Sequence, residues 1–111
     1  TRGLLGGAEF SKMKPGVVLA DVSRGTVVDQ TALMAALETG TVSGAVLDVF
    51  EEEPLPDTSQ LWDAKNVIIS PHCSSVYDGW ELASFDLFLE NLDHWMNERP
   101  LMNVVDPGKG Y

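Results

Sequence analysis

The chain has 111 residues, 44% hydrophobic and 22% charged, which is the composition of an ordinary globular domain large enough to bury a core. Its net charge of -10 argues against nucleic acid and against an anionic membrane surface as partners. A single cysteine, Cys73, excludes an internal disulfide and fits a reducing, cytoplasmic environment. No apolar run is long enough to span a membrane.

The first half of the chain alternates helical and strand patterns. Residues 8–13 predict a short helix, which the following Pro15 ends. A β-branched run over 17–22 predicts a buried strand of a parallel sheet. Asp29 is a good N-cap for a helix that continues to Glu38.

The second half continues this alternation. Residues 44–49 and 66–70 predict two further buried strands, and 51–63, rich in glutamate and proline, predicts a loop between them. Such an order of helices and strands winds right-handed, so we expect an α/β fold with about three parallel strands and flanking helices.

A long amphipathic helix is predicted from about Tyr77 to Asn97. Its apolar residues recur every three or four positions: Phe85, Phe88, Leu89, Leu92, Trp95 and Met96. Pro100 ends this helix, and we expect residues 101–111 to form an extended tail.

Three residues with catalytic side chains follow the three predicted strands. Arg24, Glu53 and His72 each come shortly after an apolar run. Because parallel strands end at one edge of a sheet, these side chains are expected to converge there. Residue type alone leaves Glu51 and Glu52 as rivals to Glu53, and a surface arginine, a loop histidine and a solvated acidic face stay open as alternatives.

Three segments resemble signatures of the D-isomer-specific 2-hydroxyacid dehydrogenases. They are VLADVSRGTVVD at 18–29, GAVLDVFEEEPL at 44–55 and NVIISPH at 66–72. All three occur in the order and spacing of that family. The resemblance implies half of a doubly wound Rossmann-type parallel sheet followed by a long C-terminal helix.

The resemblance also implies catalytic roles for three residues. Arg24 would bind the carboxylate and carbonyl of a small 2-oxo or 2-hydroxy acid, since a guanidinium presents a planar fork to an oxoacid. His72 would be the general acid/base. Glu53, the acid directly before Pro54, would orient this imidazole and favour its protonated form.

NAD or NADP is the cofactor that the resemblance implies. The residues expected to line it are Val22, Ser23, Arg24, Asp48, His72 and Ser74. Asp48 would accept from the nicotinamide carboxamide, although a structural hydrogen-bonding role is open for this buried acid. A Gly-rich turn after a strand is missing, because Gly3, Gly6 and Gly7 follow no predicted strand.

By the same resemblance, residues 1–98 are the C-terminal half of an NAD-binding domain with its long helix. Residues 99–111 are a tail that would return to the substrate domain. The chain begins without methionine and without a strand, so we expect a part of a longer protein, inactive alone. Its uncovered apolar faces should drive association, and we expect a homo-oligomer.

Other functions remain open at this stage. An NADH-sensing, non-catalytic co-repressor shares the fold and the three residues, and a formate or phosphite oxidiser shares the scaffold. Two departures from the family pattern are Asp21, in place of an asparagine, and Cys73 beside His72. A thiolate–imidazole nucleophile is disfavoured because adjacent side chains point apart. His72 and His94 lack the spacing of metal ligands, so no metal site is expected.

Overall fold

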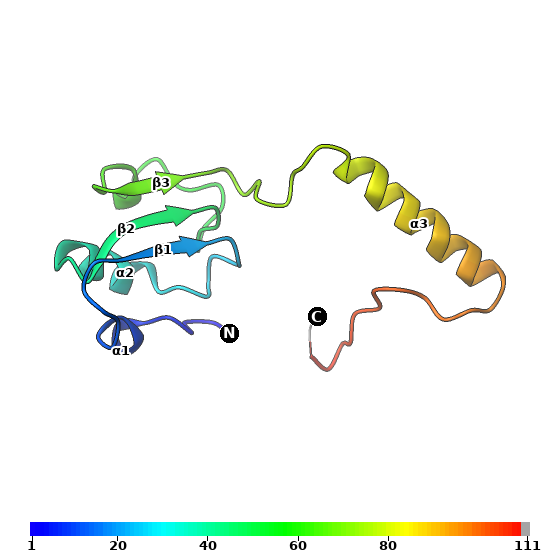
Figure 1. Ribbon diagram of the computed structural model, residues 1–111, viewed down its shortest axis with the longest axis horizontal. Coiled ribbons are helices and arrows are strands. Elements are labelled where there is room, and N and C mark those ends of the chain that lie inside the picture. Colours follow the sequence, from blue (N-terminus) through cyan, green and yellow to red (C-terminus); the bar gives the residue numbers. More distant parts are fainter. Residues whose placement is uncertain (110–111) are drawn as a thin grey trace. The chain divides into compact units, whose positions relative to one another are not determined.

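The computed structural model describes residues 1–109 of the chain. Contacts divide the chain into two units, Thr1–Ser75 and Val76–Tyr111. The first unit contains a small sheet with its helices, and the second contains a long helix (Figure 1). The expected boundary after residue 98 separates the NAD-binding part of the chain from the tail of the substrate domain. This boundary stays a prediction.

The sheet of the first unit has three parallel strands in the order β1-β2-β3 (Figure 1). These strands are β1 (Val17–Asp21), β2 (Val42–Leu47) and β3 (Val67–Ile69). At their carboxyl ends Asp21 pairs with Leu47, which in turn pairs with Ile69. All three strands therefore end at one edge, which confirms the expected parallel α/β fold.

The strand boundaries differ slightly from those expected, and side chains explain why. β1 ends at Asp21 because its carboxylate accepts from the backbone N–H of Ser23 and turns the chain. β2 lies two residues earlier than expected, because Val42 already pairs with Val17 and the last pairs of the strand are made by Leu47. β3 stops before Ser70, whose hydroxyl also donates to Asp48.

Two helices flank the sheet in the first unit. The helix α1 (Gly7–Phe10) is shorter than the predicted 8–13, because tighter bonds such as Met13 N–H to Phe10 C=O replace the α-helical pattern. The helix α2 (Gln30–Glu38) begins as predicted after Asp29, whose side chain accepts from the N–H of Ala32 at 3.0 Å.

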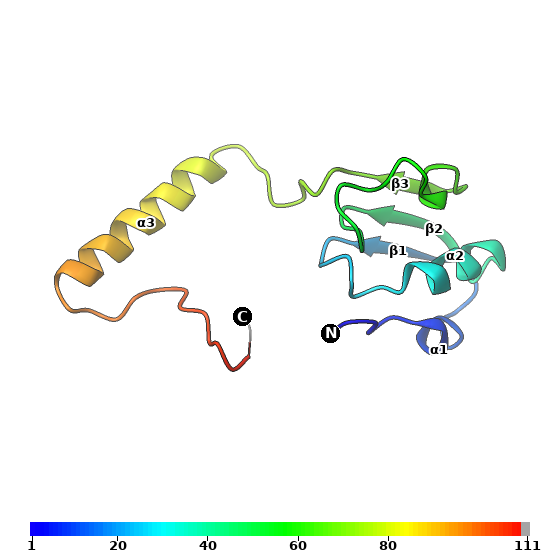
Figure 2. The ribbon, with the colours of Figure 1, turned by 180° about the vertical axis from the view of Figure 1, so that it is seen from behind.

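The core lies between the sheet and its helices on one face, which Figure 2 shows with α2 in front of the strands. Its buried members are Phe10, Val28, Leu33, Ala36, Val42, Ala45, Leu47, Phe50 and Leu61. On the other face of the sheet Val18 and Ile68 are exposed. β1 pairs only with β2 among the described residues, so its other edge is unpaired.

The segment 51–63 is a loop except for one short turn. Gln60–Trp62 forms the 3-10 helix η1, which begins where Ser59 Oγ accepts from the N–H of Leu61. Leu61 is buried in the core, whereas Trp62 is half exposed.

The second unit contains the helix α3 (Trp80–Met96), which starts three residues later than predicted. Gly79 precedes it with φ of 89°, a left-handed conformation that fixes this start. The following tail folds back on α3, where Met102 N–H donates to Asn91 Oδ1 at 2.8 Å. The last two residues of the expected tail lie outside the described residues. No helix in the described part is long and apolar enough to cross a membrane.

Candidate active site

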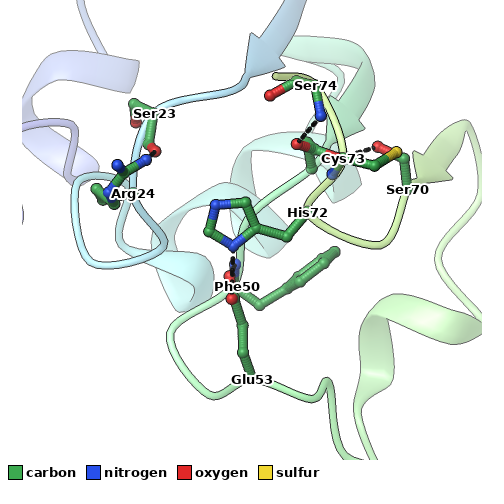
Figure 3. A network of polar contacts seen from close by, with 9 residues as sticks. Ser23, Arg24, Phe50, Glu53, Ser70, His72, Cys73 and Ser74 are labelled. Carbon is green, nitrogen blue, oxygen red and sulfur yellow. Dashed lines mark hydrogen bonds and ion pairs between the residues drawn. The ribbon is translucent and has the colours of Figure 1, made fainter. Parts of the chain in front are cut away.

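Loops from all three strands meet at the carboxyl edge of the sheet (Figure 3). The N–H of Asp48 donates to the C=O of Asp21 at 3.0 Å, and the N–H of Ser70 donates to the C=O of Leu47 at 2.9 Å. These two bonds extend the parallel pairing to Asp48 and Ser70, the first residues after β2 and β3. The loops that hold Arg24, Glu53 and His72 therefore start from a fixed backbone.

His72 and Glu53 form a hydrogen-bonded pair. Nδ1 of His72 donates to Oε2 of Glu53 at 2.7 Å, across nineteen residues of chain (Figure 3). The second oxygen of Glu53 accepts from the N–H of Phe50 at 2.9 Å. The hydrogen bond from His72, and after it the bond from Phe50, lowers the pKa of Glu53 from 4.5. Glu53 is thereby kept as a carboxylate that orients the imidazole.

Asp48 fixes the chain immediately after His72. Its Oδ1 accepts from Ser70 Oγ at 2.6 Å and from Cys73 N at 2.9 Å, and its Oδ2 accepts from Ser74 N at 2.8 Å (Figure 3). The hydrogen bond from Ser70 is the main reason that the pKa of Asp48 lies far below 3.8, although burial opposes this. His72 is held between these anchored residues with φ of 52°.

Arg24 lies in a tight turn after β1. The N–H of Val27 donates to the C=O of Arg24 at 2.9 Å and closes the turn. Asp21 Oδ1 accepts from the N–H of Ser23 at 3.0 Å and from its hydroxyl at 2.5 Å. The guanidinium is exposed and donates through Nη1 to the C=O of Ser23 at 2.7 Å. A guanidinium has five N–H donors, so most of them are available to a ligand.

A cavity of about 640 Å³ lies beside His72 and Glu53. Its lining is mostly apolar and includes Phe50, Leu55, Trp62 and Ile69, together with Glu53 and His72. The side chains of His72 and Glu53 are themselves 42% and 36% exposed at this cavity.

Some of the predicted site residues are hydrogen-bonded to each other, and others only share a backbone turn. His72 contacts Glu53, and Asp48 contacts Ser74. Arg24 and Ser23 share a turn that Asp21 holds, and Val22 is exposed next to them. Glu51 instead pairs with Arg2 at 3.7 Å, so of the acids considered Glu53 is the one hydrogen-bonded to His72.

Two polar contributors were not predicted. Ser70 donates to Asp48, and its place at a strand end two residues before His72 is the signal that could have indicated it. The N–H of Phe50 holds Glu53, and a backbone donor leaves no trace in a sequence. The described residues contain no group of three or more side chains placed to hold a metal ion.

Parallel strands with polar loops at their carboxyl edge define a Rossmann-type α/β domain. Residues 1–74 match the family described as D-isomer specific 2-hydroxyacid dehydrogenase, NAD binding domain. The chain belongs to this family.

Among curated proteins, the chain is 49% identical over 107 residues to glyoxylate/hydroxypyruvate reductase B of Pectobacterium carotovorum subsp. carotovorum, covering 96% of the chain and 33% of the reductase. It thus spans about a third of the length of such relatives.

Solved structures show the same likeness. A D-isomer specific 2-hydroxyacid dehydrogenase from Xanthobacter autotrophicus Py2, in complex with NADPH and MES, matches with a TM-score of 0.91 and 40% identity, covering 100% of this chain and 45% of that one. The NADPH-dependent glyoxylate/hydroxypyruvate reductase of Sinorhizobium meliloti, in complex with NADP and sulfate, matches with a TM-score of 0.91 and 33% identity, covering 100% and 36%.

Proposed function

We propose that the chain supplies the proton-transfer and anion-binding wall of an NAD(P)-dependent reductase of small 2-oxo acids, of the glyoxylate and hydroxypyruvate class. The observation that carries this proposal is the 2.7 Å hydrogen bond from His72 Nδ1 to Glu53. It leaves Nε2 as the ring nitrogen for a substrate, since this atom makes no hydrogen bond within residues 1–109.

His72 is the general acid in reduction. Its Nε2 gives a proton to the carbonyl oxygen as that oxygen becomes a hydroxyl, and takes the proton back in the reverse direction. Glu53 stabilises the protonated imidazole that this step requires, because the carboxylate faces Nδ1. Imidazole suits the role because it changes its charge near neutral pH.

Arg24 binds the anionic end of the substrate. Its guanidinium is exposed at the carboxyl edge of the sheet and uses one nitrogen on Ser23. The remaining donors match a carboxylate, which accepts two parallel N–H bonds from an arginine. Holding the substrate in this way aligns its carbonyl oxygen for proton transfer.

The cofactor-facing residues are Val22, Ser23, Arg24, Asp48, His72 and Ser74. A nicotinamide held there would supply or accept hydride at the substrate carbon. One feature of the chain fits such a group directly, since Val22 exposes an apolar side chain at the edge. Asp48 is buried and already accepts from Ser70, Cys73 and Ser74, so it would act toward the cofactor by holding the chain after His72.

The test is a chimera in which this chain replaces the matching third of the Pectobacterium carotovorum reductase. We expect the chimera to reduce glyoxylate and hydroxypyruvate with NADPH or NADH. His72→Ala and Arg24→Ala should each lower kcat/KM by roughly 10²–10⁴-fold while cofactor binding is retained. A chimera that binds the cofactor as tightly as its parent but reduces neither acid would contradict the proposal and favour a cofactor-sensing role.

A further inference from the structure

Gly25, directly after Arg24, has no room for a side chain. A Cβ built there would lie 1.7 Å from the carbonyl oxygen of Phe50, 1.9 Å from its carbonyl carbon and 2.6 Å from its Cα. Real Cβ contacts stay beyond 3.0 Å. The obstacle is backbone, which cannot rotate away as a side chain can. The conformation of Gly25 is not left-handed, so space alone requires glycine here.

Phe50 links this contact to the acid–base pair. Its carbonyl faces Gly25, and its N–H donates to Oε1 of Glu53 at 2.9 Å. The other oxygen of Glu53 holds His72. Phe50 is only 6% exposed, and its side chain is part of the core. The two loops are therefore in contact at a residue that the packing keeps in place.

Arg24 moves with Gly25, because both belong to one closed turn. The bond from Val27 N–H to Arg24 C=O fixes this turn at its end, and Asp21 fixes its beginning through Ser23. A shift at Gly25 is thus passed to Arg24, since the turn has few other ways to relax.

We propose that Gly25 is a positioning residue, whose close approach to the Phe50 carbonyl sets where Arg24 stands relative to the Glu53–His72 pair. This inference rests on the proposed function. The substrate must reach the guanidinium with its carboxylate and Nε2 of His72 with its carbonyl oxygen. Both groups are close together in a 2-oxo acid, so the spacing between the two loops decides whether the substrate can engage them simultaneously.

The test compares Gly25→Ala with Gly7→Ala in the chimera. A Cβ at Gly7 has no neighbour within 4 Å, so Gly7→Ala should keep parental kinetics. Gly25→Ala must separate the loops by about 1 Å or more, and a misplacement of that size lowers kcat/KM by about 100-fold. In an Arg24→Ala background the same change should cost less than in the parent, because part of its effect acts through Arg24.

A second readout follows the link through Phe50. In the chain itself, carbon-13 NMR of the Glu53 carboxyl should show a higher pKa after Gly25→Ala, because the bond from Phe50 N–H is disturbed. A gentler variant, Thr26→Gly, adds no atoms and loosens the same turn. It should raise KM for glyoxylate and leave the Glu53 titration unchanged.

The outcomes separate the two proposals. An inactive chimera with Gly25 intact would overturn the proposed function, and the positioning role with it. An active chimera in which Gly25→Ala or Thr26→Gly keeps the parental KM would overturn the positioning role alone. A Gly25→Ala protein that fails to fold beside a folded Gly7→Ala protein would also overturn it, in favour of a purely structural glycine.

Discussion

The backbone N–H of Asp48 donates to the carbonyl oxygen of Asp21 at 3.0 Å, and so joins the ends of two neighbouring strands through residues whose side chains both hold loops. The carboxylate of Asp21 holds the turn of Arg24, and that of Asp48 holds the chain after His72. Two buried acids thus organise the edge of the sheet through hydrogen bonds to its loops.

Acid should weaken the fold through these carboxylates. The pKa values of Asp48 and Glu53 lie below 3.8 and 4.5 in the folded chain, so the unfolded chain binds more protons in acid. The two carboxylates stabilise the fold fully at pH values above 3.8 and 4.5, their ordinary pKa values. This stabilisation is lost as the pH falls through the lowered pKa values of the folded chain. Urea unfolding across this range should show the decrease.

Asp48→Asn tests which acid contributes most to this effect. The amide nitrogen of asparagine would face the N–H of Ser74, donor against donor, and so destabilise the loop at neutral pH. The difference in unfolding free energy between variant and wild type should narrow below pH 3.8. An unchanged difference at all pH values would assign the acid dependence to other groups. Asp57→Asn, in an exposed loop, is the control.

Glu53→Gln should change the pH profile of the chimera. A neutral amide stabilises the protonated imidazole less than a carboxylate does, so reduction should fail first at the alkaline side. We expect kcat/KM to fall by about 10²-fold and the alkaline limb to move to lower pH. Glu51→Gln removes the same charge from an acid that pairs with Arg2 and should leave the profile in place. An unmoved profile for Glu53→Gln would contradict the pairing.

Leu33→Ala should destabilise the first unit strongly. The side chain of Leu33 is 0% exposed and lies in the core between α2 and the sheet. Its truncation should lower the unfolding free energy by about 2–5 kcal/mol, measured by urea denaturation. Val18→Ala, at a position 69% exposed, should cost under about 0.5 kcal/mol. Equal losses at the two positions would contradict the core described above.

The apolar side of α3 should cause the chain to associate. Phe85 and Phe88 are exposed, with ring centroids 6.2 Å apart, and α3 has no buried residue. Light scattering should give a mass above the 12.1 kDa of one chain. Phe88→Glu should lower that mass, whereas Glu90→Gln on the same helix should not. A monomer at all concentrations would rule out the association.

The sequence contained enough information for the order of elements and for the pairing of His72 with Glu53. Nearly uninterrupted apolar runs located β1 and β3 to within one residue at each end, and the resemblance to family motifs selected Glu53 over its neighbours. The contact between Gly25 and Phe50 could not be predicted from the sequence. The need for glycine at this position becomes visible only when the position of the Phe50 backbone is known. The anchoring by Ser70 likewise depends on β2 and β3 pairing in register.

The amino ends of the strands carry none of the proposed site residues. Turns with positive φ at Gly16, Gly40 and Asn66 precede β1, β2 and β3, and the N–H of Gly16 donates to the C=O of Gly40 at 3.1 Å. This rim of the sheet is where a fluorescent label or a short insertion can report on this domain without touching the reacting groups.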